Sequence, residues 1–105
     1  MGYIDNIKNY LELVYGYTDV PDEVIEKYVK LIEIELGVSL THLLNNNVEE
    51  AIVLVASSIA YDKKKEETIV KEKIGDYSYE KDKDLVNSIK QTNDIYKRRV
   101  MKYYG

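Results

Sequence analysis

Residues 51–60 read Ala-Ile-Val-Leu-Val-Ala-Ser-Ser-Ile-Ala, the longest apolar run in a chain of 105 residues. Its β-branched and leucine residues would also suit a buried strand. Asn47 and Glu50, however, resemble the capping box that begins a helix, and the Lys- and Glu-rich stretch 63–67 favours a helical end. The sequence therefore predicts a central helix over about 47–65, apolar on nearly every side and buried in the core.

Two amphipathic segments precede this central helix. The first predicts a helix over about 3–15, because its apolar residues recur at spacings of three and four: Ile4, Ile7, Leu11 and Val14. The second predicts a helix over about 21–36, with Pro21 in the first turn, where its missing N–H costs nothing. Between this helix and the central one, residues 38–44 predict one irregular or helical turn.

A change of apolar period follows the central helix. Val70 and Ile74, and then Tyr77 and Tyr79, stand at even spacings that fit one face of a strand, and Gly75-Asp76 between the two pairs suits a two-residue turn. The pattern predicts a short β-hairpin over about 69–80. Two short strands are marginal on their own, so this hairpin would need the helices or another chain to complete it.

The last segment predicts a helix over about 83–104, the longest element of the chain. Its apolar stripe consists of Leu85, Ile89, Tyr96, Val100 and Tyr103. The expected fold is mainly α, a small bundle of about four helices with a short β-hairpin before a long C-terminal helix. A chain of this length predicts a single domain over 1–105.

Charge is unevenly divided along the chain. Residues 1–62 carry three lysines against eleven acids, net −8, whereas residues 63–105 carry twelve cations against eight acids, net +4. This division indicates either two solvated surfaces or two surfaces that attract each other between copies of the chain. The composition adds eleven tyrosines without tryptophan or phenylalanine. Such tyrosines suit interfaces, although an AT-rich genome would leave the same composition.

Nothing in the sequence selects a catalytic or metal-binding site. The chain lacks cysteine and the sequence motifs of phosphate-binding loops, nucleotide-binding folds, serine hydrolases and zinc proteases. His42 is the only histidine and has no companion with which to hold a metal or form a catalytic pair. We therefore expect no enzyme activity, no cofactor and no metal. The longest apolar run is about half of a membrane span, so we expect a soluble protein without membrane contact.

Basic clusters at 63–65 and 97–99 could contact phosphates. The chain as a whole is acidic, with a pI near 5.0, and has no recognisable nucleic-acid-binding module. A solvated helix end is the simpler interpretation of the first cluster. The second leaves one alternative function open, that of a small helical regulatory protein that binds DNA or a bacterial regulator through its basic C-terminal helix.

Residues 74–78 read Ile-Gly-Asp-Tyr-Ser, preceded by Val-Lys-Glu-Lys and followed by Tyr79. In this stretch the chain resembles the small head-tail connector proteins of tailed bacteriophages and prophages. In that family an apolar central helix, a hairpin-like stretch with this pattern and a long C-terminal helix follow one another. The order of the expected elements is similar over most of the chain, although only about a dozen residues are specific to the family.

The resemblance implies a structural adaptor and no enzyme. Members of the family form rings, commonly twelve-fold, beneath the portal, extend the DNA channel and join the filled head to the tail. The implied partners are the portal protein, the adjacent head-completion or tail protein, and further copies of the chain, which can stay monomeric until they meet the portal. Passing DNA would be contacted only without sequence preference. The implied location is the virion, after synthesis in the bacterial host cytoplasm.

The residues expected to carry assembly fall into two groups. The hairpin supplies the first group, which consists of Ile74, Gly75, Asp76, Tyr77 and Tyr79. The last helix supplies the second group, which consists of Arg98, Arg99 and Tyr103.

Overall fold

The computed structural model describes residues 2–75 and 79–105. Its elements are, in chain order, α1 (Tyr3–Tyr10), the π-helix η1 (Leu11–Tyr15), α2 (Asp22–Leu36), α3 (Thr41–Asn45), α4 (Glu49–Ile74), α5 (Tyr79–Met101) and the 3-10 helix η2 (Lys102–Tyr104). The described residues contain no strand. The predicted mainly α class is therefore confirmed.

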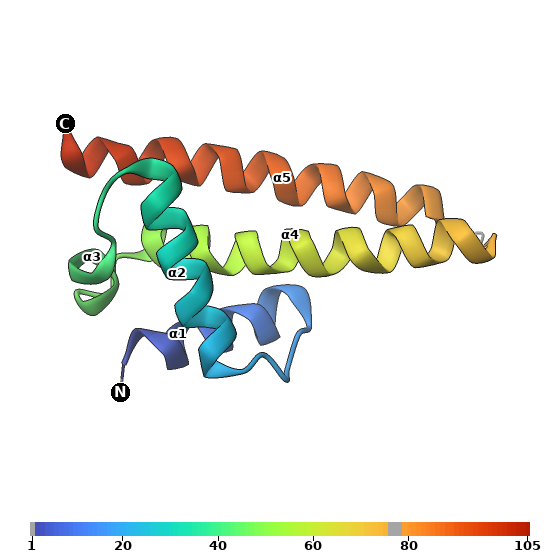
Figure 1. Cartoon of the computed structure of the whole chain (residues 1–105), viewed down its shortest axis with the longest axis horizontal. Helices are drawn as coiled ribbons and strands as arrows, with labels where there is room; N and C mark the ends of the chain where they lie inside the picture. Colours follow the sequence, from blue (N-terminus) through green and yellow to red (C-terminus); the bar gives the residue numbers. More distant parts are fainter. Residues whose placement is uncertain (1, 76–78) are drawn as a thin grey trace.

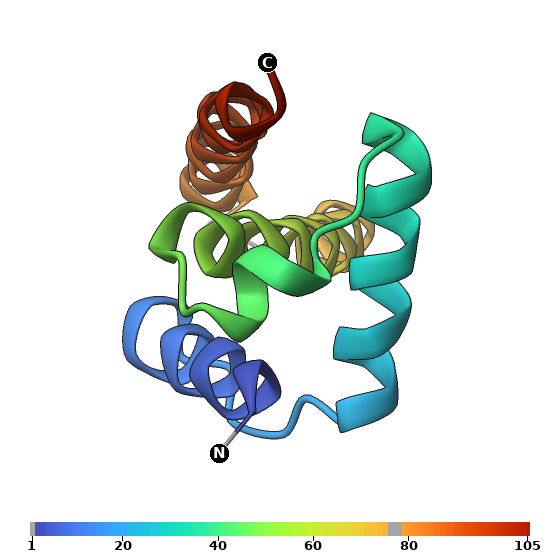
Figure 2. The same ribbon diagram turned by 90° about the vertical axis from the view of Figure 1, so that its left-hand side faces the viewer.

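α4 and α5 run antiparallel along the longest dimension of the molecule, 44 Å. α1, α2 and α3 gather around the N-terminal half of α4 (Figures 1 and 2), and the far ends of α4 and α5 project beyond them. We call this projecting part, residues 64–75 and 79–86, the arm. Both chain ends lie at the opposite end of the molecule from the tip of the arm (Figure 1).

The core lies around the first half of α4. Within the run 51–60 every residue is buried except Ile52 and Ser58, which are half-buried. Apolar side chains from the surrounding elements close over this run, and the largest are Ile7, Leu11, Ile25, Leu40 and Leu44. The run thus occupies the central position that its composition predicts, because a helix that is apolar all round must be covered on all sides.

The predicted β-hairpin is wrong. Residues 70–74 form the last turns of α4, and α5 begins at Tyr79. Val70 and Ile74 are four residues apart, a spacing that fits one face of a helix as well as one face of a strand. The Lys-Glu-Lys between them consists of good helix formers, which favours continuation of α4. Asp76, Tyr77 and Ser78, the rest of the predicted turn and second strand, lie outside the described residues.

The start of α4 also differs from the prediction. Val48, in an extended conformation, precedes the helix without a side-chain cap, and Asn47 has a positive φ of 56°. The side chain of Asn47 instead accepts a hydrogen bond from Asn6 Nδ2 at 2.7 Å, which ties this turn to α1. The predicted capping box is therefore absent. With 26 residues against 23, α4 rather than α5 is the longest helix that the structure describes.

Candidate functional site

The predicted assembly residues occupy opposite ends of α5. Ile74 and Gly75 form the end of α4 at the tip of the arm, and Tyr79 begins α5 there. Arg98, Arg99 and Tyr103 lie about 30 Å away, at 1.5 Å per helical residue. Asp76 and Tyr77 lie outside the described residues. The structure therefore does not bring the two groups together, and each belongs to a separate surface.

Gly75 ends α4 in the left-handed conformation, with φ at 71°. Its N–H donates a hydrogen bond to the carbonyl of Glu72 at 3.3 Å. A Cβ placed on Gly75 would meet no heavy atom within 4 Å. Glycine is favoured here because of the backbone conformation, not because of crowding.

The contact of α5 with α4 follows a heptad-like seam. Spacings of four and three residues connect its members, which include every buried residue of α5 that the structure describes: Asp82, Val86, Ile89, Asn93, Tyr96 and Val100. The seam differs from the predicted apolar stripe of this helix. Leu85 and Tyr103, both in that stripe, are 50% and 52% exposed, because the seam passes through the polar residues Asp82 and Asn93 instead.

In the arm, polar side chains lie buried between α4 and α5, and several large apolar side chains lie on the surface. The buried residues in its described part are Thr68 and Asp82, which are 7% and 6% exposed. Val86 is half-buried in the seam, whereas four other large apolar side chains of the arm have exposed fractions between 44% and 71%: Ile69, Val70, Ile74 and Leu85. We call these four residues the arm patch. Val70 and Ile74 are neighbours one helical turn apart on α4. Adjoining exposed apolar residues are typical of surfaces that contact another molecule.

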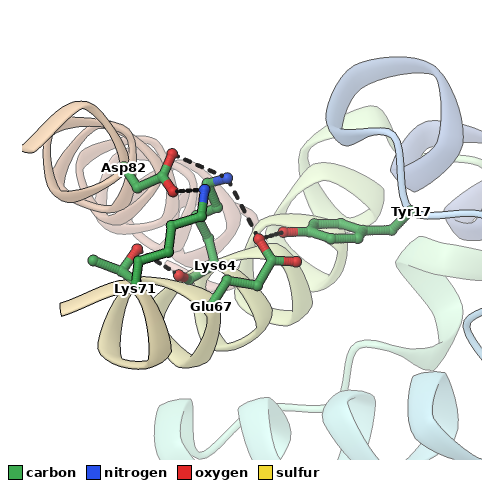
Figure 3. A network of polar contacts seen from close by, with 6 residues as sticks. Tyr17, Lys64, Glu67, Lys71 and Asp82 are labelled. Atoms are coloured by element: carbon green, nitrogen blue, oxygen red, sulfur yellow. Dashed lines mark hydrogen bonds and ion pairs between the residues drawn. The ribbon is translucent and has the colours of Figure 1, made fainter. Parts of the chain in front are cut away.

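An ion-pair network holds the arm together (Figure 3). The Asp82 carboxylate of α5 accepts a hydrogen bond from Lys71 and lies 3.3 Å from Lys64 Nζ, both on α4. Lys64 also lies 3.4 Å from Glu67, whose carboxylate accepts a hydrogen bond from the hydroxyl of Tyr17 at 3.5 Å. The hydrogen bond from Lys71, followed by that from Lys64, holds the pKa of Asp82 below its ordinary value.

A second polar layer joins α4 and α5 inside the bundle. The Nδ2 atom of Asn93 lies 2.9 Å from Ser57 Oγ, 2.7 Å from Ser58 Oγ and 3.3 Å from the carbonyl oxygen of Leu54. Asn93 is 8% exposed and Ser57 is fully buried. A buried amide with specific partners fixes how two helices align along their seam. This layer sets the register of α5 against α4.

The C-terminal end of α5 is anchored mainly by tyrosines. Tyr104 donates a hydrogen bond to the carbonyl of Ser39, and the Tyr103 hydroxyl lies 3.3 Å from a carboxylate oxygen of Glu50. The guanidinium of Arg99 lies 4.8 Å from the centre of the Tyr96 ring, a cation-π contact. Arg98 is exposed and makes no ion pair with any described residue. Arg98 therefore stays available to a partner.

Two grooves flank the seam. One, of about 240 Å³, lies between α2 and the α4–α5 pair and has Tyr28 and Asp62 in its wall, whose side chains are joined by a hydrogen bond of 2.5 Å. The other, of about 430 Å³, is lined by Tyr10, Val14, Tyr15, Tyr17, Lys64, Leu85, Ser88, Ile89 and Thr92. Burial raises the pKa of both Tyr15 and Tyr17 to about 12, so these phenols stay neutral at ordinary pH.

The described residues contain no group of three or more potential metal ligands of the His, Cys, Asp or Glu type. His42 is exposed and packs edge-on against the ring of Tyr104, with the ring centres 5.7 Å apart. Among residues 2–75 and 79–105, no helix is both long enough and apolar enough to cross a bilayer.

Comparison with known proteins identifies no relative. No protein-family model, no curated protein and no solved structure matches this chain.

Two features of these surfaces are not apparent from the apolar pattern. Asp82 and Asn93 belong to the helix contact but not to the predicted stripe of α5, because that stripe contains apolar residues and tyrosines alone. Their spacing of eleven residues, with Ile89 between them, fits the same heptad phase and was the available signal. The exposed arm patch was hidden by the hairpin prediction, which assigned Val70 and Ile74 to a strand.

Proposed function

We propose that this chain is a structural adaptor of a tailed phage or prophage, which assembles as a ring beneath the portal, extends the DNA channel and joins the filled head to the tail. The observation that carries the proposal is the arm, with polar residues in its seam and apolar residues on its outside. This arrangement leaves the adaptor an exposed apolar element with which to engage the portal or the neighbouring head-completion protein.

The energetics of the arm favour a partner. An isolated helical hairpin gains most from placing apolar side chains between its helices, because their burial stabilises by about 25 cal/mol per Å². Here Thr68 and Asp82 occupy the seam, while Ile74 at the tip is 71% exposed. Burial of Val70 and Ile74 in a contact with a second protein would recover this free energy on binding.

The resemblance to head-tail connectors points to the same part of the molecule. Of the residues that carry it, the described ones, 70–75 and 79, lie at the tip of the arm, the part farthest from the bundle (Figure 1). Ile74 and Gly75 lie there, and Tyr79 begins the returning helix. The tip is therefore the first place at which we expect an adjoining head or tail protein to make contact.

The test is capture by the portal protein of the same phage or prophage. Size-exclusion chromatography with light scattering would be run on the chain alone and on its mixture with the portal. We expect stoichiometric capture of the chain. The variant Val70→Asp/Ile74→Asp should lose capture and keep its helical circular dichroism, because both side chains are exposed. Ile34→Asp is the matched control, since Ile34 is 78% exposed on α2, away from the arm.

Three results would count against the adaptor. The chain could ignore the portal, or the arm variant could be captured as well as the wild type. The third is tight binding to short duplex DNA that weakens steeply with salt, which would favour the regulatory alternative instead. Lys97 pairs with Glu35 at 3.0 Å and Arg99 packs on Tyr96, so two cations of the basic helix end are already engaged within the chain.

A further inference from the structure

An acidic surface surrounds η1 and the connection to α2. Residues 9–26 contain five acids and no lysine or arginine. Glu12 and Asp19 are exposed, and neither carboxylate pairs with any described side chain. Beside Glu12, Leu13 and Val14 are 85% and 54% exposed. We call Glu12, Leu13, Val14 and Asp19 the acidic face.

A basic surface lies on the outer side of α5 near its end. Ile95, Arg98, Arg99 and Lys102 fall within about 100° of one another at 3.6 residues per turn, on the side away from the seam. Ile95 is 39% exposed, and the three cations are exposed. Arg98 and Lys102 form no ion pair with any part of the chain that the structure describes. We call these four residues the basic face.

The two faces match each other in chemistry. Each combines exposed apolar side chains with charges of one sign, and the signs are opposite. α4 lies between α1 and α5 in both views (Figures 1 and 2), so the end of α5 does not fold back on the acidic turn of its own chain. Complementary charges that no contact within the chain neutralises steer two molecules together and fix their register.

We propose that the acidic face of one copy docks on the basic face of the next copy. Because the two faces are unlike, the contact is heterologous, and repeated copies either close into a ring or extend as a filament. Leu13 and Val14 then cover Ile95, while Glu12 and Asp19 meet Arg98 and Lys102. This inference deepens the proposed function, since it assigns the contact between neighbouring copies to residues outside the arm.

The experiment measures self-association by sedimentation equilibrium, up to about 1 mM chain, the weak end of specific association. We expect assembly beyond a dimer that weakens as salt rises from about 50 mM to 500 mM, because the charges are exposed. Arg98→Glu/Lys102→Glu should weaken association about tenfold or more, and so should Glu12→Lys/Asp19→Lys. Lys27→Glu/Lys30→Glu, which reverses two exposed lysines of α2 outside both faces, is the matched control and should leave association within about twofold.

The decisive result is rescue. An equimolar mixture of the two reversed variants, and a chain that carries all four substitutions, should both associate as well as the wild type. A wild type that stays monomeric at low salt, or reversed variants that fail to restore each other, would overturn the inference. Portal capture is a separate readout that depends on the arm. If the reversed variants restore each other's association but the portal does not capture the chain, the adaptor function is refuted and the contact between copies stands. If the portal captures the chain but the variants do not restore each other, the contact between copies is refuted and the adaptor function stands.

Discussion

The buried amide of Asn93 offers the sharpest test of how α5 is held. The substitution Asn93→Ala removes both amide hydrogens from Ser57 Oγ, Ser58 Oγ and the Leu54 carbonyl, which lie 2.7–3.3 Å away. Ser57 is fully buried, so water cannot readily replace the lost donor. The variant therefore leaves the hydroxyl oxygens of Ser57 and Ser58 without a donor in the middle of the helix contact, while the Leu54 carbonyl still accepts from both serine hydroxyls.

The expected loss of stability follows from these contacts. Each lost hydrogen bond contributes about 1 kcal/mol, and a buried polar group left unsatisfied adds a penalty of similar size. We expect Asn93→Ala to lower the free energy of unfolding by about 2–3 kcal/mol. For a chain of 105 residues, this corresponds to a fall in Tm on the order of 10 °C.

Urea unfolding followed by circular dichroism at 222 nm measures the change, and a double-mutant cycle isolates the contact. Ser57→Ala alone should cost about 1 kcal/mol, and the double variant should cost about 1 kcal/mol less than the sum of the two single changes. Gln91→Ala, on the exposed side of the same helix, should stay within about 0.5 kcal/mol of the wild type. A cost for Asn93→Ala as small as that of Gln91→Ala, or full additivity, would refute the reasoning.

Three further predictions concern the arm and the tyrosines. Gly75→Val should leave the helical core folded, by circular dichroism, and weaken portal capture, because a β-branched residue resists the positive φ of 71° at the arm tip; unchanged capture would contradict it. The pKa of Asp82 in the folded chain is lowered, so its ion pairs with Lys71 and Lys64 stabilise the fold at pH values above the ordinary pKa of 3.8. This stabilisation is lost as the pH falls below 3.8 and through the pKa of the folded chain. Asp82→Asn should therefore flatten the acid limb of a plot of urea midpoint against pH, and an unchanged limb would count against the network. Absorbance at 295 nm should show Tyr15 and Tyr17 ionising near pH 12 rather than pH 10, and the free energy of unfolding should fall between these two pH values. Tyr15→Phe should remove one of the ionisation steps near pH 12. A single transition of all tyrosines near pH 10 would contradict the raised pKa values.

The sequence predicts the helices of the bundle well where the apolar residues follow only one spacing. The run 51–60 has no polar face, so a central position was the only way to cover it. The stripe from Ile4 to Val14 likewise allowed one interpretation, and α1 and η1 occupy the predicted range 3–15. In both segments the apolar pattern and the local helix propensity agree, which makes prediction from sequence dependable.

The prediction of a hairpin in the arm is wrong because the spacing of its apolar residues fits both a strand and a helix. Val70 and Ile74 lie on one face of either a strand or a helix, and the choice depends on continuation from the stable helix before them. The seam of α5 was only partly visible for another reason. Ile89 and Val100 were found through their apolar character, whereas Asp82 and Asn93 enter the contact through hydrogen bonds and ion pairs with partners up to 39 residues away. No local pattern encodes such distant partners.

The assembly role of the predicted site residues stays a prediction. Arg98 is exposed without a partner among the described residues, whereas Tyr103 is held by Glu50 of its own chain. The sequence shows the net charge of −8 over residues 1–62 but does not show which acids share a surface with exposed apolar residues. Leu13 is 85% exposed although Leu11, two residues earlier in the π-helix η1, is fully buried.

The heptad spacing of the α4–α5 seam means that the length of the arm can change in steps of seven residues. An insertion of seven residues into each helix of the arm would keep every seam residue opposite its partner and lengthen the arm by about 10 Å, at 1.5 Å per residue. An insertion of any other small number would rotate the tip around the axis and present its apolar side chains in a new direction. The reach of the tip can thus be changed without its orientation, and without any substitution in the core.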